Sequence, residues 1–132
     1  MAMFELVEFS SLDWPAALKL LFALCIGHAL ADFPLQGEYL ATAKYRRFLI
    51  HLQDPSRPVS IWIVCMAAHC LIHAGAVWVV TGSALLAVME LVLHWGIDMA
   101  KCEGKTSFNQ DQSLHFVCKI TYVGMVWAGI GV

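Results

Sequence analysis

The residues of this sequence that could take part in chemistry form four pairs of histidine or aspartate side chains, with the members of each pair four positions apart in the chain. The pairs are His28 with Asp32, His69 with His73, His94 with Asp98, and Asp111 with His115. On a helix, residues four apart lie on one face a turn apart, so each pair can present two polar groups together. Glu90 extends the third pair by one turn, and Lys119 extends the fourth. The pattern predicts a ladder of polar side chains on each of four helices.

Imidazole and carboxylate donors in this arrangement are typical of sites for zinc, manganese or iron. We expect the metal ligands to be His28, Asp32, His94, Asp98, Asp111 and His115. His69 and His73 are the candidates to complete the site or to act as acid and base. Eight donors exceed one tetrahedral site, so the sequence predicts one or two divalent ions, with some carboxylates bridging or orienting histidines. The five cysteines show no CxxC spacing, so we expect buried thiols and neither a disulfide framework nor a thiolate site.

Four further residues are assigned to the surroundings of the site. Glu90 lies about one turn deeper than His94, near only His73, and is expected to have a supporting or structural role. Lys101 and Lys119, together with Arg46, are expected to attract an anionic headgroup, although Lys119 could equally be a snorkelling or hydrogen-bonded lysine.

Each pair also has a purely structural explanation. A histidine in a membrane helix can serve only as a hydrogen-bonding group at a helix interface. Asp32 could pair with Lys44 or Arg46, and Asp111 could cap a helix. One pair on every apolar span, at similar depth, favours a common polar centre, which a metal or a proton relay would use. Haem is disfavoured because acids lie one turn from the histidines.

The composition predicts that these helices belong to a membrane protein. The chain has 132 residues, of which 60% are hydrophobic and 14% charged, with a mean hydropathy of +0.70. The hydrophobic fraction is higher, and the charged fraction lower, than in typical soluble domains. Apolar spans cover residues of about 15–33, 59–80, 84–100 and 111–131, and a basic amphipathic helix of about 37–52 is expected in the headgroup layer. We therefore expect a single all-α membrane domain, 1–132, with four transmembrane helices in a bundle.

The distribution of lysine and arginine predicts the orientation of the chain. All six basic residues of the connecting segments follow the first or the third span, namely Lys44, Arg46, Arg47, Arg57, Lys101 and Lys105. The N-terminal segment and the short turn between the second and third spans contain none. Because cytoplasmic loops carry an excess of positive charge, we expect both termini outside the cytoplasm of a bacterial inner membrane.

Four segments of the chain carry a family resemblance. They are HALADFPLQ from His28, the pair His69 and His73, HWGIDMAK from His94, and FNQDQSLH from Phe108. In this order they resemble the signatures of the domain-of-unknown-function 3307 family of small bacterial and phage membrane proteins. The resemblance runs from about Leu21 to Val117 and implies that these polar positions belong to one recurring design, without implying an activity. More loosely, the pattern is similar to membrane-bound metal-dependent hydrolases.

These features favour a membrane-embedded metal-binding protein and, more specifically, a metal-dependent hydrolase. Its expected substrate is a phosphoester of a lipid or lipid-linked molecule at the cytoplasmic leaflet, since a bound metal activates water and polarises phosphoryl oxygens. Two alternatives stay open. One is a non-enzymatic membrane module that moves metal or protons, or binds a partner, with a structural metal site; the other is a di-iron membrane oxidase. A homo-oligomer is compatible with the sequence, and no nucleic-acid partner is expected.

Overall fold

The computed structural model describes residues 13–52, 56 and 58–131, and within these ranges every regular element is a helix. In chain order the helices are α1 (Trp14–Asp32), α2 (Gly37–Ala43), α3 (Arg46–Leu52), α4 (Ile61–Thr81), α5 (Ala84–Cys102) and α6 (Phe108–Trp127). The prediction of an all-α protein is confirmed. Residues 1–12, 53–55, 57 and 132 lie outside the described part of the chain.

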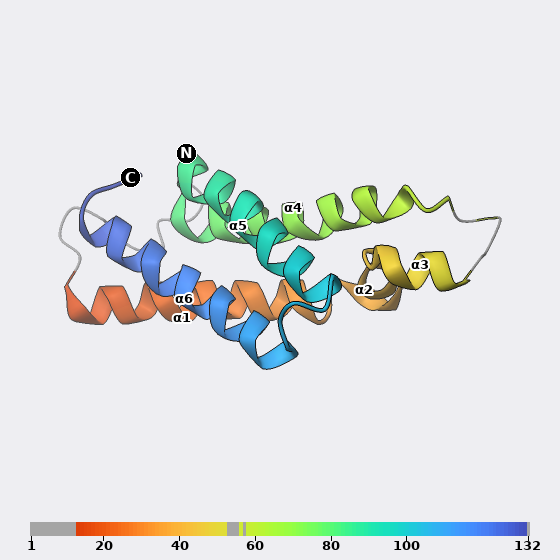
Figure 1. Cartoon of the computed structure of the whole chain (residues 1–132). Helices are drawn as coiled ribbons and strands as arrows, with labels where there is room; N and C mark the ends of the chain where they lie inside the picture. Colours follow the sequence, from red (N-terminus) through yellow and green to blue (C-terminus); the bar gives the residue numbers. More distant parts are fainter. Residues whose placement is uncertain (1–12, 53–55, 57, 132) are drawn as a thin grey trace.

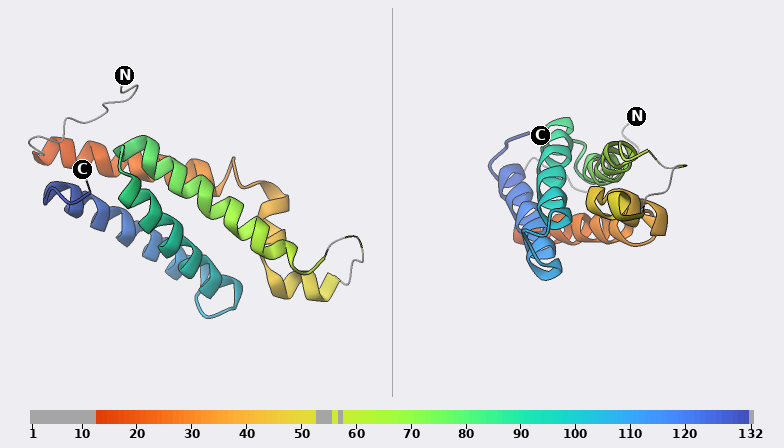
Figure 2. Two further views of the ribbon diagram at one scale, coloured as in Figure 1. Left: turned by 90° about the horizontal axis from the view of Figure 1, so that it is seen from above. Right: turned by 45° about the vertical axis from the view of Figure 1, so that its right-hand side comes forward.

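Helices α1, α4, α5 and α6 form a four-helix bundle. Helix α4 packs on α1 and α5, and α6 closes the ring by packing on α5 and α1. Consecutive long helices run in opposite directions, so the connection from α1 to α4 and the loop from α5 to α6 lie at one end, here called the loop end (Figure 1). The turned views in Figure 2 show α2 and α3 at the loop end, beside the beginning of α4.

Local capping explains where the long helices begin. Helix α1 starts as expected, because Asp13 Oδ1 accepts a hydrogen bond of 2.8 Å from the Ala16 backbone N–H. Helix α6 starts at Phe108, earlier than the expected residue 111. The reason is a capping box, in which Ser107 Oγ accepts from the Gln110 N–H and Gln110 Oε1 accepts from the Ser107 N–H. Asp111 therefore lies inside the helix and is not its cap.

The segment expected to form one interfacial helix is divided into α2 and α3. At the junction the Tyr45 N–H donates to the Thr42 carbonyl, which tightens the last turn of α2. The prediction of a continuous surface helix was wrong for Lys44, whose exposed fraction is only 3%. A buried ion pair with Asp98 holds Lys44 inside the bundle, whereas Arg46 stays exposed.

The interior of the bundle is divided into an apolar and a polar half. Away from the loop end lies an apolar cluster of Leu20, Leu24, Val77, Leu86, Tyr122 and Val126. Toward the loop end the interior is filled by His69, His73, Glu90, His94, Asp98, Asp111, His115 and Lys119. A second apolar cluster of Met66, Cys70 and Cys102 packs between α4 and α5, and Tyr45 covers it. This burial raises the pKa of the Tyr45 phenol.

The five cysteines are free thiols, of which Cys65, Cys70 and Cys102 are buried. Of the described helices, α1 and α4 are long and apolar enough to cross a membrane. Composition alone therefore supports two of the four expected spans.

Candidate metal centre

The four histidine and aspartate pairs converge in the polar half of the bundle. Each long helix contributes one pair: His28 and Asp32 from α1, His69 and His73 from α4, His94 and Asp98 from α5, and Asp111 and His115 from α6. The rings of His73 and His94 stack with their centroids 3.7 Å apart, and those of His94 and His115 stack at 4.1 Å. The four pairs that the sequence predicted on separate helices therefore lie together in one polar centre.

His69, near the middle of α4, lies level with Asp98 in the structure. Its Nε2 atom is 3.2 Å from Asp98 Oδ2. The reason is that α4 extends beyond the other long helices at the loop end (Figure 1). Its middle, rather than its first turns, therefore reaches the polar centre.

One group of four donors has the geometry of a metal site. Asp32, His69, His73 and His94 each offer one ligand atom, and these atoms lie within 4.8 Å of one another. Asp32 Oδ1 is 3.1 Å from His73 Nε2 and 3.5 Å from His69 Nε2. Tetrahedral zinc with bonds of about 2.0–2.1 Å separates its ligand atoms by roughly 3.3 Å. The observed separations fit such an ion.

Two further groups overlap with the first. They are His28, His73, Glu90 and His94, and the smaller set of His94, Asp98 and His115. His94 belongs to all three groups, so they are overlapping arrangements and not three separate sites. The charge of the neighbouring side chains distinguishes which of the three groups is best suited to a cation.

Lysines neutralise three of the four acids in this centre. Lys44 Nζ lies 2.5 Å from Asp98 Oδ2, Lys101 Nζ lies 2.8 Å from Asp111 Oδ2, and Lys119 Nζ lies 2.5 Å from Glu90 Oε1. For Asp32, the described partners are imidazoles and an amide. His28 Nε2 is 3.3 Å from its Oδ2 atom, and Gln112 Nε2 donates to the same oxygen at 3.0 Å. A buried charge requires compensation, so the Asp32 group is the part of the centre best suited to a cation.

Several imidazole nitrogens of the centre are buried without a hydrogen-bond partner. They are the Nδ1 atoms of His28, His69 and His73. Buried polar atoms in folded proteins are almost always paired, if not by protein then by water or an ion. The unpaired nitrogens therefore agree with a centre that takes up a further species.

Glu90 orients one of the candidate ligands. The expectation that it lies near only His73 was wrong. Its Oε1 atom is 3.1 Å from His94 Nδ1 and 4.0 Å from His73 Nδ1, and Tyr122 donates to its Oε2 atom at 2.8 Å. Because the carboxylate accepts the proton on Nδ1, the lone pair of His94 is left on Nε2, which points into the Asp32 group. This arrangement suits a supporting role.

Lys119, Lys101 and Arg46, which the sequence assigned to one headgroup-binding role, have different surroundings in the structure. Lys119 is 2% exposed and bound to Glu90, so it compensates that acid inside the bundle. Lys101 is 16% exposed and bound to Asp111, and Arg46 is exposed at the loop end. The sequence offered Lys44 only as a possible partner of Asp32, whereas in the structure its Nζ atom is bound to Asp98. Its inward position depends on the tertiary contact with Asp98.

The partly exposed members of the centre lie between α1 and α6. His28 and Asp32 retain 13% and 11% of their side-chain exposure, whereas His69 retains 0%. Gln112 on α6 is also partly exposed. This side is therefore the least buried part of the centre.

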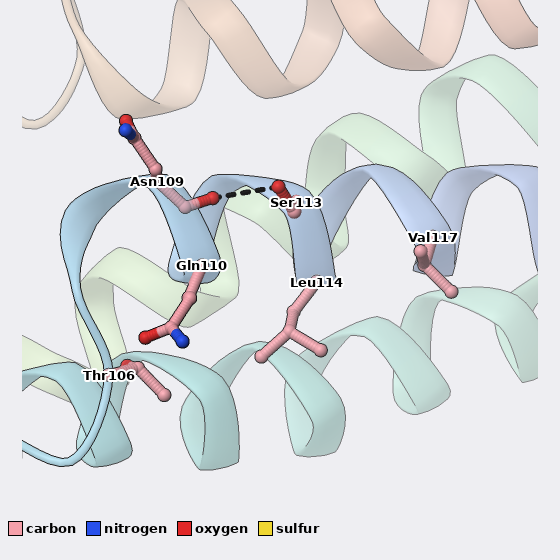
Figure 3. Close-up of a pocket in the computed structure, with 6 residues that line it drawn as sticks. All are labelled: Thr106, Asn109, Gln110, Ser113, Leu114 and Val117. Atoms are coloured by element: carbon pink, nitrogen blue, oxygen red, sulfur yellow. Dashed lines mark hydrogen bonds between the residues drawn. The ribbon is translucent and has the colours of Figure 1, made fainter.

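Two outer grooves are distinct from the polar centre. The first, of about 430 Å³, is lined by Thr106, Asn109, Gln110, Ser113, Leu114 and Val117. Figure 3 shows these residues on the start of α6 and the loop before it, with Ser113 Oγ donating to the Asn109 carbonyl at 2.8 Å. The second, of about 400 Å³, lies between α1 and α4 and is lined by apolar residues that include Leu30, Leu35 and Ile72.

Comparison with known proteins gives the chain a family. No curated protein and no solved structure matches it significantly. The family described as "Protein of unknown function (DUF3307)" matches residues 20–130, a range that contains all four pairs. The resemblance inferred from the motifs is confirmed, and the chain belongs to the DUF3307 family.

Proposed function

We propose that this protein is a membrane-embedded, metal-dependent hydrolase that acts on a phosphoester of a lipid or lipid-linked substrate. The observation that carries the proposal is the group of Asp32, His69, His73 and His94, whose four donor atoms lie within 4.8 Å of one another. Three helices supply these donors, and the acid among them lacks a described lysine partner. Neutral imidazoles with one carboxylate are the ligand set that suits a zinc-like ion.

The surface of the bundle supports a location in the membrane for all four long helices. Helices α5 and α6 bury their ionisable residues, apart from the partly exposed Lys101, and expose apolar ones, among them Leu85, Val88 and Val92 on α5 and Phe116, Val117 and Ile120 on α6. In a soluble bundle the polar residues face outward, so this distribution is reversed. Inward-facing charges also lower the mean hydropathy of a helix, which explains why composition alone selects only α1 and α4.

The residues of the centre would have different roles in hydrolysis. A divalent cation held by the Asp32 group would lower the pKa of a bound water and polarise a phosphoryl oxygen. Glu90 keeps His94 in the tautomer that offers Nε2 to the ion. His28 lies beside this group and is partly exposed; its Nε2 atom is 3.3 Å from Asp32 Oδ2, whereas its Nδ1 atom has no hydrogen-bond partner. It is therefore the best-placed side chain to transfer a proton at the reacting phosphoester. In this scheme His69 and His73 act as ligands.

A lipid substrate agrees with the surroundings of the centre. Leu30 and Leu35, on either side of Asp32 in the chain, line the apolar groove between α1 and α4, which could accommodate a hydrocarbon chain. Arg46 and Arg47 are exposed at the loop end, where they would attract a phosphate headgroup. By the distribution of positive charge, the loop end faces the cytoplasm.

A translocation pathway is less compatible with the described interior. Such a pathway needs polar groups that continue across the bundle. Beyond Glu90 and Lys119, the interior is occupied by Tyr122 and the apolar cluster around Leu20 and Leu86. The pairing of Asp98 and Asp111 with lysines also favours one ion over a di-iron pair.

Metal content tests the first part of the proposal. Protein purified in detergent without chelators should contain one equivalent of a divalent metal by elemental analysis. Asp32→Asn should lower the affinity for zinc by at least about 100-fold, because it removes the carboxylate ligand. Asp13→Asn is the matched control, since asparagine preserves the cap of α1 far from the centre. Protein without stoichiometric metal would contradict the proposal.

Hydrolysis tests the second part. The metal-loaded protein should release water-soluble phosphate compounds from vesicles that contain phospholipids or polyprenyl phosphates. His28→Gln should retain the metal and reduce the rate by about 10²–10⁴-fold, the range for loss of a general acid or base. Bound metal without hydrolysis of any of these substrates would leave only a structural role for the ion.

A further inference from the structure

We infer that Gln112 on α6 is a positioning residue, which makes Asp32 bind the metal ion through one carboxylate oxygen and so leaves a coordination position free for water. The inference rests on the metal-binding part of the proposed function, because it concerns the same group of donors. It gives a role in that site to α6, which supplies none of the four donors of the Asp32 group.

The two carboxylate oxygens of Asp32 have different partners. Oδ1 lies 3.1 Å from His73 Nε2 and 3.5 Å from His69 Nε2, so it is the oxygen that faces the other donors. Oδ2 accepts a hydrogen bond of 3.0 Å from Gln112 Nε2, and His28 Nε2 lies 3.3 Å from it. Hydrogen bonds of this kind fix the orientation of a carboxylate ligand. Asp32 therefore presents one oxygen to an ion.

The amide of Gln112 is itself held in one orientation. Its Nε2 atom also donates to Asp111 Oδ2 at 3.3 Å, and Lys101 Nζ binds that same oxygen at 2.8 Å. Ionised carboxylates only accept hydrogen bonds, so the NH₂ group of Gln112, and not its oxygen, has to face Asp32 and Asp111. Asp111, whose charge Lys101 compensates, thus anchors Gln112. A neutral donor suits this place, because an ammonium beside Asp32 would repel the cation.

The number of oxygens that Asp32 contributes determines whether the ion has room for water. One oxygen from Asp32 and one nitrogen from each of three histidines give four protein ligand atoms. Zinc in catalytic sites expands to five ligands, which leaves a position for the reacting water. With both oxygens of Asp32 bound, the protein would fill that position. His28 has to change its contacts when it transfers a proton, whereas the Gln112 amide keeps its protons throughout.

Infrared spectroscopy of the zinc-loaded protein tests the inference without a measurement of activity. The asymmetric and symmetric stretches of a carboxylate lie further apart when one oxygen binds a metal than when both do. Difference spectra between zinc-loaded and zinc-free protein, assigned with isotopically labelled aspartate, should show the wide separation for the wild type. Gln112→Met removes the donor at similar size and should give the narrow separation.

Gln36→Met is the matched control for this variant. Gln36 Nε2 donates to the backbone carbonyl of Asp32 at 3.1 Å and not to its carboxylate. The same substitution at position 36 should therefore keep the wide separation.

Affinity and activity should respond differently in Gln112→Met. The second oxygen of Asp32 takes the place of water, so the affinity for zinc should stay within about 10-fold of the wild type, whereas kcat should fall by about 10–100-fold. A merely structural role of Gln112 would lower both together.

The outcomes separate this inference from the proposed activity. A narrow separation in the wild type, a measurement that needs no variant, would overturn the inference, as would a wide separation in folded Gln112→Met. A wide separation in the wild type and a narrow one in the variant, without hydrolysis by either protein, would support the inference and refute the proposed activity. A wild type that binds no metal would refute both.

Discussion

At the scale of single residues, the partner of each buried acid determines what that acid can do. Glu90 is surrounded by Lys119, Tyr122 and His94, so its charge and its geometry are both fixed. Asp32 contacts imidazoles and the Gln112 amide, so its charge is open to compensation by a cation. The Glu90 carboxylate is thus suited to orienting His94, whereas the Asp32 carboxylate is suited to binding a cation.

Replacing Glu90 tests the orienting role. Glu90→Gln should lower the affinity for zinc by about 10–100-fold, the usual effect of losing a hydrogen-bond partner of a metal-binding histidine. It should also lower the melting temperature, because Lys119 loses its anion, and breaking one partner of a buried pair costs about 3–5 kcal/mol. Affinity is measured by competition with a chromophoric chelator well below the melting transition.

The control for this variant is Glu103→Gln. Glu103 pairs with Arg47, whose side chain is 64% exposed, so we expect little change in stability or affinity. An affinity for zinc in Glu90→Gln equal to that of the wild type would show that Glu90 does not orient His94.

At the scale of secondary structure, the start of each helix and its distance from its neighbours bring the pairs together. The capping box at Ser107 begins α6 early enough to place Asp111 inside the helix. Between α1 and α4, Gly27 lies so close to Ala76 that an added Cβ atom would be 3.3 Å from the Ala76 Cβ. Gly27 directly precedes His28, so this close approach positions the first pair against His73.

A valine at position 27 tests whether this approach is required. Gly27→Val should push α1 away from α4, lower the stability by about 1–3 kcal/mol as expected for overpacking, and weaken zinc binding at least 10-fold. Gly75→Val is the matched control, because it places the same β-branched residue in a helix where a Cβ meets no atom within 4 Å. Thermal unfolding and zinc titration of both variants provide the comparison. Equal behaviour of the two would show that the spacing of α1 and α4 is not critical.

At the scale of the whole molecule, the bundle has charged groups inside and apolar groups outside. Lys44, Lys101 and Lys119 compensate acids in the interior, while large apolar side chains such as Val92, which is 64% exposed, cover the surface. In water this surface would favour aggregation, whereas in lipid it carries no such penalty. The distribution explains why we place α5 and α6 in the membrane with α1 and α4.

An arginine on the outer face of α5 tests this placement. Val92→Arg should reduce the amount of membrane-inserted protein, because a charged side chain near the centre of a span costs about 2.5–3.5 kcal/mol on the insertion scale. Asn109→Arg, on an exposed position at the loop end, should insert normally. The amount of each variant that stays in the membrane fraction after an alkaline carbonate wash is compared. Soluble, folded Val92→Arg protein would contradict a membrane span at α5.

Much of the architecture could be predicted from the residues because the relevant signals are local. The apolar spans predicted the long helices to within a few residues, since the apolar pattern of a helix is a local signal. The spacing of four residues placed each histidine with its partner on one face of a helix. The motifs predicted the DUF3307 family, which the match over residues 20–130 confirms.

The partners of the charged residues depended on contacts between helices and could not be predicted in this way. Lys44 and Asp98 are distant in the chain, and only the packing of the α2–α3 junction against the bundle brings them together. Local pattern assigned Lys44 to the membrane surface, because amphipathicity describes a helix by itself and not its neighbours. The same packing leaves Asp32 among imidazoles. Sequence thus predicted that a polar centre exists, whereas the distances between helices determine which half of it can hold a cation.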